Sequence, residues 1–111
     1  MSVKSERIAT TIKRILSETL QQKTKDKDIG FVTITDVRVS SDISYAKVYV
    51  TFLDHSEKRL AALQKAGGFL RSELASQMDL FKVPQLSFIL DDSLQKGNRI
   101  DQILDQQKNR Q

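Results

Sequence analysis

The sequence predicts a two-layer α+β sandwich, in which a three-stranded sheet carries helices on one of its faces. Three observations predict this fold. Apolar residues recur at helical spacing near the N-terminus and again over residues 57–78. Residues 31–53 are rich in β-branched and aromatic side chains and contain neither proline nor glycine. A shorter strand-like run at 84–90 follows the second helical region, and a final helix is expected after it.

The first helix is expected over about residues 5–23, with Ser5 as its N-cap. Arg7, Arg14 and Glu18 lie opposite the apolar stripe on the helical wheel. That stripe consists of Ile8, Ile12, Ile15, Leu16 and Leu20. A polar segment closed by Gly30 ends this helix.

Residues 31–53 are expected to form a β-hairpin with one buried face. Val32 and Ile34 share a face, but Val37 and Val39 have the opposite parity, which predicts a bulge or bend at Asp36. The segment "SSDIS" supplies turn-forming residues between the two strands. In the second strand, the residues expected on the buried face are Ala46, Val48, Val50 and Phe52, and those facing solvent are Tyr45, Lys47, Tyr49 and Thr51.

The second helical region, which has Ser56 as its expected cap, is interrupted by a glycine doublet at Gly67 and Gly68. Each glycine is about 1 kcal/mol less favourable than alanine in a helix interior. The apolar phase nevertheless continues through the doublet, along Leu60, Leu63, Leu70 and Leu74. The glycines free the backbone to bend and allow another backbone to approach closely. On the residues alone, two roles of the glycines remain equally open. They could admit the backbone of a nucleic acid, or they could let the two helices pack on the sheet.

The third strand is expected to begin at Pro84, where a missing N–H is tolerated, and it aligns Leu86, Phe88 and Leu90. After a polar loop, Asn98 starts the last predicted helix. The apolar residues of that helix are Ile100, Ile103 and Leu104. We expect one domain over residues 1–105 and a frayed tail over 106–111.

The charge of +4 is unevenly distributed. Residues 1–27 contain seven Lys and Arg against three acids, and residues 58–90 contain five against two. These two basic segments flank a mildly acidic one at 28–57. If the basic segments fold onto one face, they form an electrostatic surface for a polyanion such as a nucleic acid.

Composition excludes several classes of protein. There is no cysteine, and therefore no disulfide framework or thiolate metal site. No apolar run approaches the roughly 20 residues that span a bilayer, and the N-terminus does not resemble a secretory signal. We therefore expect a cytoplasmic protein without a membrane partner, a metal or another cofactor.

Catalysis has few candidate residues. His55 is the one histidine, and no nucleophile signature accompanies it. The acidic pairs Asp91–Asp92 and Asp26–Asp28 could hold a metal or perform acid–base chemistry, but their polar loops favour turn and cap roles. We predict that the protein is not an enzyme, and a hydrolase that uses these acidic loops is the competing hypothesis.

Aromatic and cationic residues alternate on the predicted open face of the sheet. Tyr45 and Tyr49, with Lys47 and Arg38, could stack nucleobases. The alternative is a cross-strand tyrosine pair that shields an exposed sheet.

Four runs together resemble the bacterial ribosome-binding factor A family. They are "FVTITDVRVSSDISYAKVYVTFL", "LQKAGGFLRSELASQM", "VPQLSFILDDSL" and "GNRIDQIL", and the resemblance extends from Arg7 to about Leu104. It implies a type II K-homology-like fold, in which an Ala-x-Gly kink joins two helices. Ala66, Gly67 and Gly68 match that kink position by position.

The resemblance also implies a function. Members of this family are non-enzymatic assembly factors that bind the free 30S small ribosomal subunit and its 16S rRNA late in maturation. They support processing of the rRNA 5′ end and growth in the cold, and a ribosome-associated GTPase assists their release. Two departures from the family are the segment "KDKDIG", where an Asp-Pro-Arg turn is usual, and a short C-terminal tail. We expect a monomer.

We expect RNA contacts around the kink and on the neighbouring basic residues. Lysines and arginines would neutralise phosphates, and the glycines would let the RNA backbone approach. The predicted contacts are Lys65, Gly67, Gly68 and Arg71 at the kink, with Arg7, Lys13, Arg14 and Lys82 beside it. A generic RNA-binding module or protein–protein adaptor is the alternative.

Overall fold

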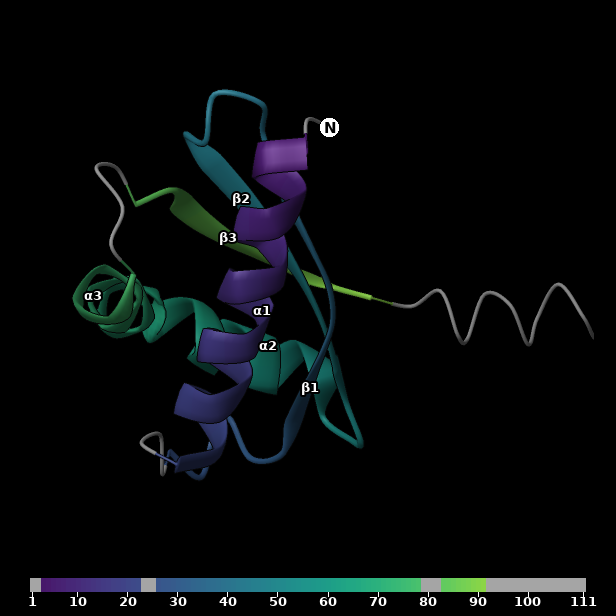
Figure 1. Ribbon diagram of the computed structural model, residues 1–111. Coiled ribbons are helices and arrows are strands. Elements are labelled where there is room, and N and C mark those ends of the chain that lie inside the picture. Colours follow the sequence, from purple (N-terminus) through teal and green to yellow (C-terminus); the bar gives the residue numbers. More distant parts are fainter. Residues whose placement is uncertain (1–2, 23–25, 79–82, 92–111) are drawn as a thin grey trace, which may run out of the picture.

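The computed structural model describes residues 3–22, 26–78 and 83–91 (Figure 1). Its helices and strands follow the predicted order as far as the third strand. They are α1 (Val3–Gln22), β1 (Val32–Val39), β2 (Tyr45–Phe52), α2 (Ser56–Lys65), α3 (Gly67–Gln77) and β3 (Gln85–Leu90). The predicted last helix and the tail lie outside the described residues.

The three strands form one sheet with β2 in the centre. β1 and β2 are antiparallel, which confirms the predicted hairpin, and β3 pairs with β2 in the parallel direction. A parallel pair requires a long crossover, and the segment with α2 and α3 provides it between β2 and β3.

The predicted irregularity at Asp36 is a bulge in β1. Ile34 pairs with Val50 and Asp36 pairs with Tyr49, so Thr35 is the extra residue. The extra residue restores the alternation, because Ile34 and the downstream valines of β1 are then all buried. The Thr35 hydroxyl lies within hydrogen-bonding distance of two acceptors, the carboxylate of Asp91 and the carbonyl oxygen of Tyr49 (3.3 Å).

The core lies between the inner face of the sheet and the three helices that cover it. α1 contributes the predicted stripe, within which Ile12 and Leu16 are completely buried. α2 and α3 continue one apolar line through the glycine doublet, since Leu63, Leu70 and Leu74 are all fully buried. This arrangement confirms the predicted two-layer α+β sandwich with helices on one face.

The opposite face of the sheet is open. Tyr45 and Tyr49 both lie on it, but they are four residues apart on β2. The expectation of a cross-strand tyrosine pair is therefore wrong. The residues that pair with them across the sheet are Asp36 and Ile89 for Tyr49, and Gln85 for Tyr45.

Two helix starts differ from the expected ones. α1 begins at Val3, so Ser5 lies inside its first turn and is buried there, and it is not the N-cap. The N-cap of α2 is His55 rather than Ser56. His55 has left-handed backbone geometry (φ 49°) and forms no side-chain cap hydrogen bond.

Candidate nucleic-acid interface

The kink predicted between the two helices is present at Ala66. α2 ends at Lys65, α3 begins at Gly67, and Ala66 between them has φ −81° and ψ 1°. The Ala66 N–H donates to the carbonyl of Ala62 (3.2 Å), and the Ala66 carbonyl accepts from the Leu70 N–H (3.0 Å). Hydrogen bonding thus continues through a change of direction. Figure 1 shows α2 running across the view and α3 turned nearly end-on.

The two glycines of the kink are not required by the backbone or by crowding inside the protein. Among the described glycines, Gly30 alone has a positive φ. A Cβ atom added to Gly67 would lie 3.8 Å from the Phe88 ring, which is ordinary contact, and one added to Gly68 would meet nothing within 4 Å. The surface above Gly68 is therefore open to an external backbone.

Lys65 lies in the last turn of α2, where a cation interacts favourably with the helix dipole. Its side chain is exposed and borders a shallow hollow of about 370 Å³ together with Lys58, Asp26 and Asp28. The Asp26 carboxylate accepts the Asp28 backbone N–H (2.9 Å), which confirms the turn role expected for that pair. The surface beside the kink therefore carries charges of both signs, and Lys65 and Ala66 line the same hollow.

Arg71 has a structural contact in addition to its predicted role. Its Nη2 donates to the Val83 carbonyl (3.0 Å) and its Nε to the Pro84 carbonyl (3.3 Å). These two bonds fasten α3 to the residues that precede β3. Part of the donor capacity of this guanidinium is therefore used inside the protein rather than available to a phosphate.

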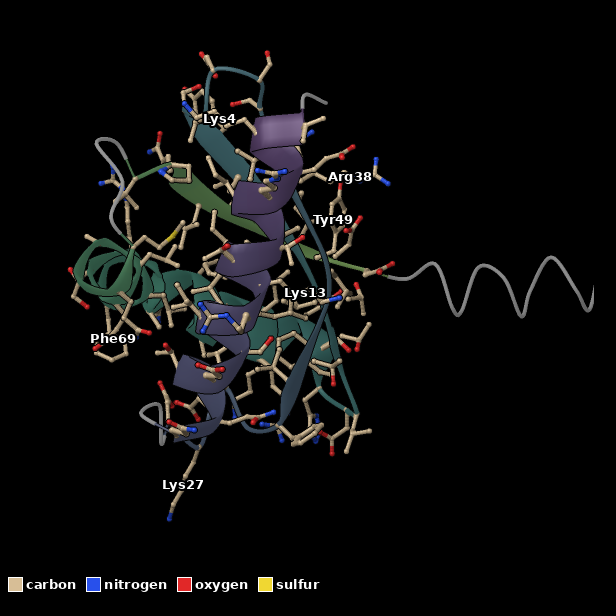
Figure 2. The ribbon with its side chains drawn as sticks, in the orientation of Figure 1. Lys4, Lys13, Lys27, Arg38, Tyr49 and Phe69 are labelled. Atoms are coloured by element: carbon tan, nitrogen blue, oxygen red, sulfur yellow. The ribbon has the colours of Figure 1, made fainter. Side chains whose placement is uncertain are left out.

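The three predicted cations of α1 fall into two groups. Arg7 and Arg14 are exposed and lie two helical turns apart. Nη1 of Arg14 lies 3.5 Å from Oε2 of Glu18, with which it forms an ion pair. Lys13 lies on the β1 side of α1, where its Nζ donates to the Thr35 carbonyl (3.4 Å) (Figure 2). The structure therefore does not bring Lys13 to the kink, and Lys82 lies outside the described residues.

Phe69, next to Gly68, is a candidate that the sequence analysis missed. Its side chain is 46% exposed, and it points away from the core at the outer side of α3 (Figure 2). An exposed aromatic ring beside an open glycine can stack on a nucleobase. Its position off the line of Leu70 and Leu74 was the signal that could have identified it.

Other kinds of site find little support in the described part of the chain. No group of three or more His, Cys, Asp or Glu there could hold a metal ion. No described helix is long and apolar enough to cross a membrane. The Asp91 carboxylate accepts the Thr35 hydroxyl, as described above, and its neighbour Asp92 lies outside the described residues.

Comparison with known proteins identifies the family. The family model of ribosome-binding factor A matches residues 4–104. The chain is also 44% identical over 107 residues to the ribosome-binding factor A of Macrococcus caseolyticus, and the match covers 94% of both chains. This chain belongs to the ribosome-binding factor A family.

Solved structures of ribosome-binding factor A have the same fold. The crystal structure of the Thermus thermophilus protein matches with a TM-score of 0.73 and 30% identity, over 78% of this chain and 93% of that one. A Thermus thermophilus homology model fitted into the cryo-EM map of a 30S complex of ribosome binding factor A matches with a TM-score of 0.67 and 31% identity, over 76% and 91%. The type II K-homology-like fold is thereby confirmed.

Proposed function

We propose that this chain is a non-enzymatic assembly factor that binds the free 30S small ribosomal subunit through its 16S rRNA late in maturation. Membership of the ribosome-binding factor A family supports the proposal. So does the fitting of a relative with 31% identity into a map of a 30S complex. The sole histidine of the chain, His55, occupies the N-cap position of α2.

The observation that carries the proposal is the geometry of the kink. Lys65 supplies a positive charge at the end of α2, and the backbone of Gly68, three residues further along the chain, is accessible. A phosphate can therefore approach the chain closely while a cation stands beside it. Phe69 adds an exposed ring on which a neighbouring base can stack.

The proposal extends to the finer properties that the family resemblance implies. Binding energy would hold immature rRNA in a selected arrangement and exclude ligands of the mature subunit. The expected consequences are support of 16S rRNA 5′-end processing and of growth in the cold, and release assisted by a ribosome-associated GTPase. We propose that the protein performs these roles as a cytoplasmic monomer.

Sedimentation with purified ribosomal particles tests this function. The protein should co-migrate with free 30S subunits and not with 50S subunits or 70S ribosomes. Treatment of the 30S particles with ribonuclease should abolish the co-migration, because the contacts are to RNA. Equal binding to all particles would contradict the proposal, and binding that survives ribonuclease would favour the protein–protein adaptor.

A further inference from the structure

The open face of the sheet contains a hollow that is separate from the kink. It encloses about 460 Å³ and is lined by Arg38, Val39, Ser40, Tyr45, Lys47 and Tyr49. The tyrosines and Lys47 alternate along β2 with the buried residues that face the helices. The hollow therefore lies on the side of the sheet opposite to α2 and α3.

Arg38 is held in a defined position at one wall of this hollow. Its Cζ lies 5.9 Å from the centroid of the Tyr49 ring, within the range of a cation–π interaction. Its Nε donates to Asp36 Oδ2 (3.1 Å), and Asp36 Oδ1 accepts the Val37 N–H (2.9 Å). The hydrogen bond that Arg38 donates to Asp36 raises the pKa of the Arg38 guanidinium, which stays charged. Arg38 and Tyr49 thus form a prearranged wall (Figure 2).

Tyr45 and Lys47 are the accessible groups of the hollow. The Tyr45 side chain is 59% exposed, and Lys47 is exposed two residues further along the same face. Lys47 pairs with Arg38 in the register of β1 and β2, so the two cations are direct neighbours across the strands. The lining residues therefore combine two aromatic rings with two cations, of which Arg38 is paired with the neighbouring Asp36 carboxylate and Lys47 has no ion-pair partner among the described residues.

We propose that this hollow binds a nucleotide of single-stranded RNA. The base stacks on Tyr45, the phosphate lies at Lys47, and the Arg38–Tyr49 wall limits the site on the other side. Single-stranded nucleic acids are bound by such combinations of aromatic rings and cations, because every base offers a planar face and every linkage a negative charge. An acidic peptide would satisfy the cations but would leave the rings without planar partners.

This inference goes beyond the proposed function, because it adds a second RNA contact on another face of the molecule. The two proposals can fail separately. Lys65→Glu should weaken binding to the 30S subunit while binding of a short RNA in the hollow stays unchanged. If Lys65→Glu abolished both, the hollow would not be an independent site.

Tyrosine fluorescence offers a direct test. The chain has two tyrosines and no tryptophan, and both tyrosines line the hollow. Titration with a short oligouridylate should quench the emission saturably, after correction with free tyrosine for absorption by the RNA. Tyr45→Ala should weaken binding about five-fold or more, with Tyr49 as the remaining reporter. Lys47→Gln should flatten the slope of log affinity against log salt by about 0.7, the value for one phosphate on a single strand.

Thr51→Ala is the matched control, since Thr51 lies on the same face of β2 but outside the hollow. It should leave both the affinity and the salt slope unchanged. The proposal is overturned if oligouridylate causes no saturable quenching, or if Thr51→Ala weakens binding as much as Tyr45→Ala. It is also overturned if a duplex RNA of the same length binds as tightly, or if a polyglutamate peptide binds more tightly than the RNA.

Discussion

Arg71 illustrates how one side chain can serve the fold at a position predicted to serve RNA. Arg71→Ala removes the hydrogen bonds to the carbonyls of Val83 and Pro84. We expect the free energy of unfolding to fall by about 1–2 kcal/mol, because a charged donor to two carbonyls is lost at a partly exposed position. Urea denaturation measures this loss. Arg7→Ala, at an exposed position of α1, should change stability by no more than about 0.5 kcal/mol. Equal stability of the two variants would contradict the structural role.

Thr19 provides a second test at the same scale. Its hydroxyl is buried in α1 and has no hydrogen-bond partner within the described part of the protein. Thr19→Val replaces that hydroxyl by a methyl group of similar size and removes the cost of an unsatisfied polar atom. We expect the free energy of unfolding to rise by about 1 kcal/mol. Thermal denaturation should show a higher midpoint, and a lower one would mean that the hydroxyl is satisfied in solution.

The residues also show where sequence reasoning stops. Helical spacing correctly placed Arg7 and Arg14 on the exposed side of α1, because that property depends on neighbours within a few turns. It could not reveal that Lys13 reaches Thr35, or that Arg71 reaches Val83. These contacts join residues that are distant in the chain, so they exist only once the helices are packed.

At the scale of elements, the glycine doublet correctly located the break between α2 and α3. The change of direction occurs at Ala66, and neither glycine has a positive φ. The doublet weakens the helix enough for the chain to turn, and the buried line through Leu63 and Leu70 keeps both halves on one core. The bulge in β1 was also predictable, because the buried positions of the strand change parity at Asp36 and this change is visible in the sequence.

Substitutions of two glycines, Gly68 at the kink and Gly30 before β1, distinguish a glycine that is open to a ligand from one that the fold requires. Gly68→Ala should leave the protein as stable or stabilise it by up to about 1 kcal/mol, because the added Cβ meets no atom and alanine favours the helix. Binding to 30S subunits should nevertheless weaken, since the methyl group occupies the space that an RNA backbone would use. Chemical denaturation and co-sedimentation measure the two effects.

Gly30→Ala is the contrasting variant. Gly30 has φ 63°, and an added Cβ would overlap Nη1 of Arg59, which itself donates to the carbonyls of Lys27 and Asp28. We expect a loss of about 1–2 kcal/mol in stability, from backbone strain and a displaced guanidinium. If Gly68→Ala destabilised the protein as much as Gly30→Ala, the kink glycine would be structural.

At the scale of the whole molecule, the layered architecture follows from local patterns. Alternation in β2 and the stripes of the helices each define one apolar face, and only a sandwich buries all of them together. Local patterns could not predict the parallel pairing of β3 with β2, because that pairing depends on the path of the crossover. The placement of the cations also depends on the fold: among the described residues, Lys65 lies at the end of α2 and Lys13 lies on the β1 side of α1.

The central claim is that the kink binds ribosomal RNA through Lys65. The most direct measurement is the affinity of Lys65→Glu for purified 30S subunits as a function of salt. Its matched control is Lys4→Glu, which changes the net charge equally at the start of α1 (Figure 2). We predict that Lys65→Glu binds more weakly than the wild type and flattens the salt slope by about one unit, while Lys4→Glu resembles the wild type. Wild-type affinity and slope in Lys65→Glu, or an equal loss in Lys4→Glu, would contradict the account.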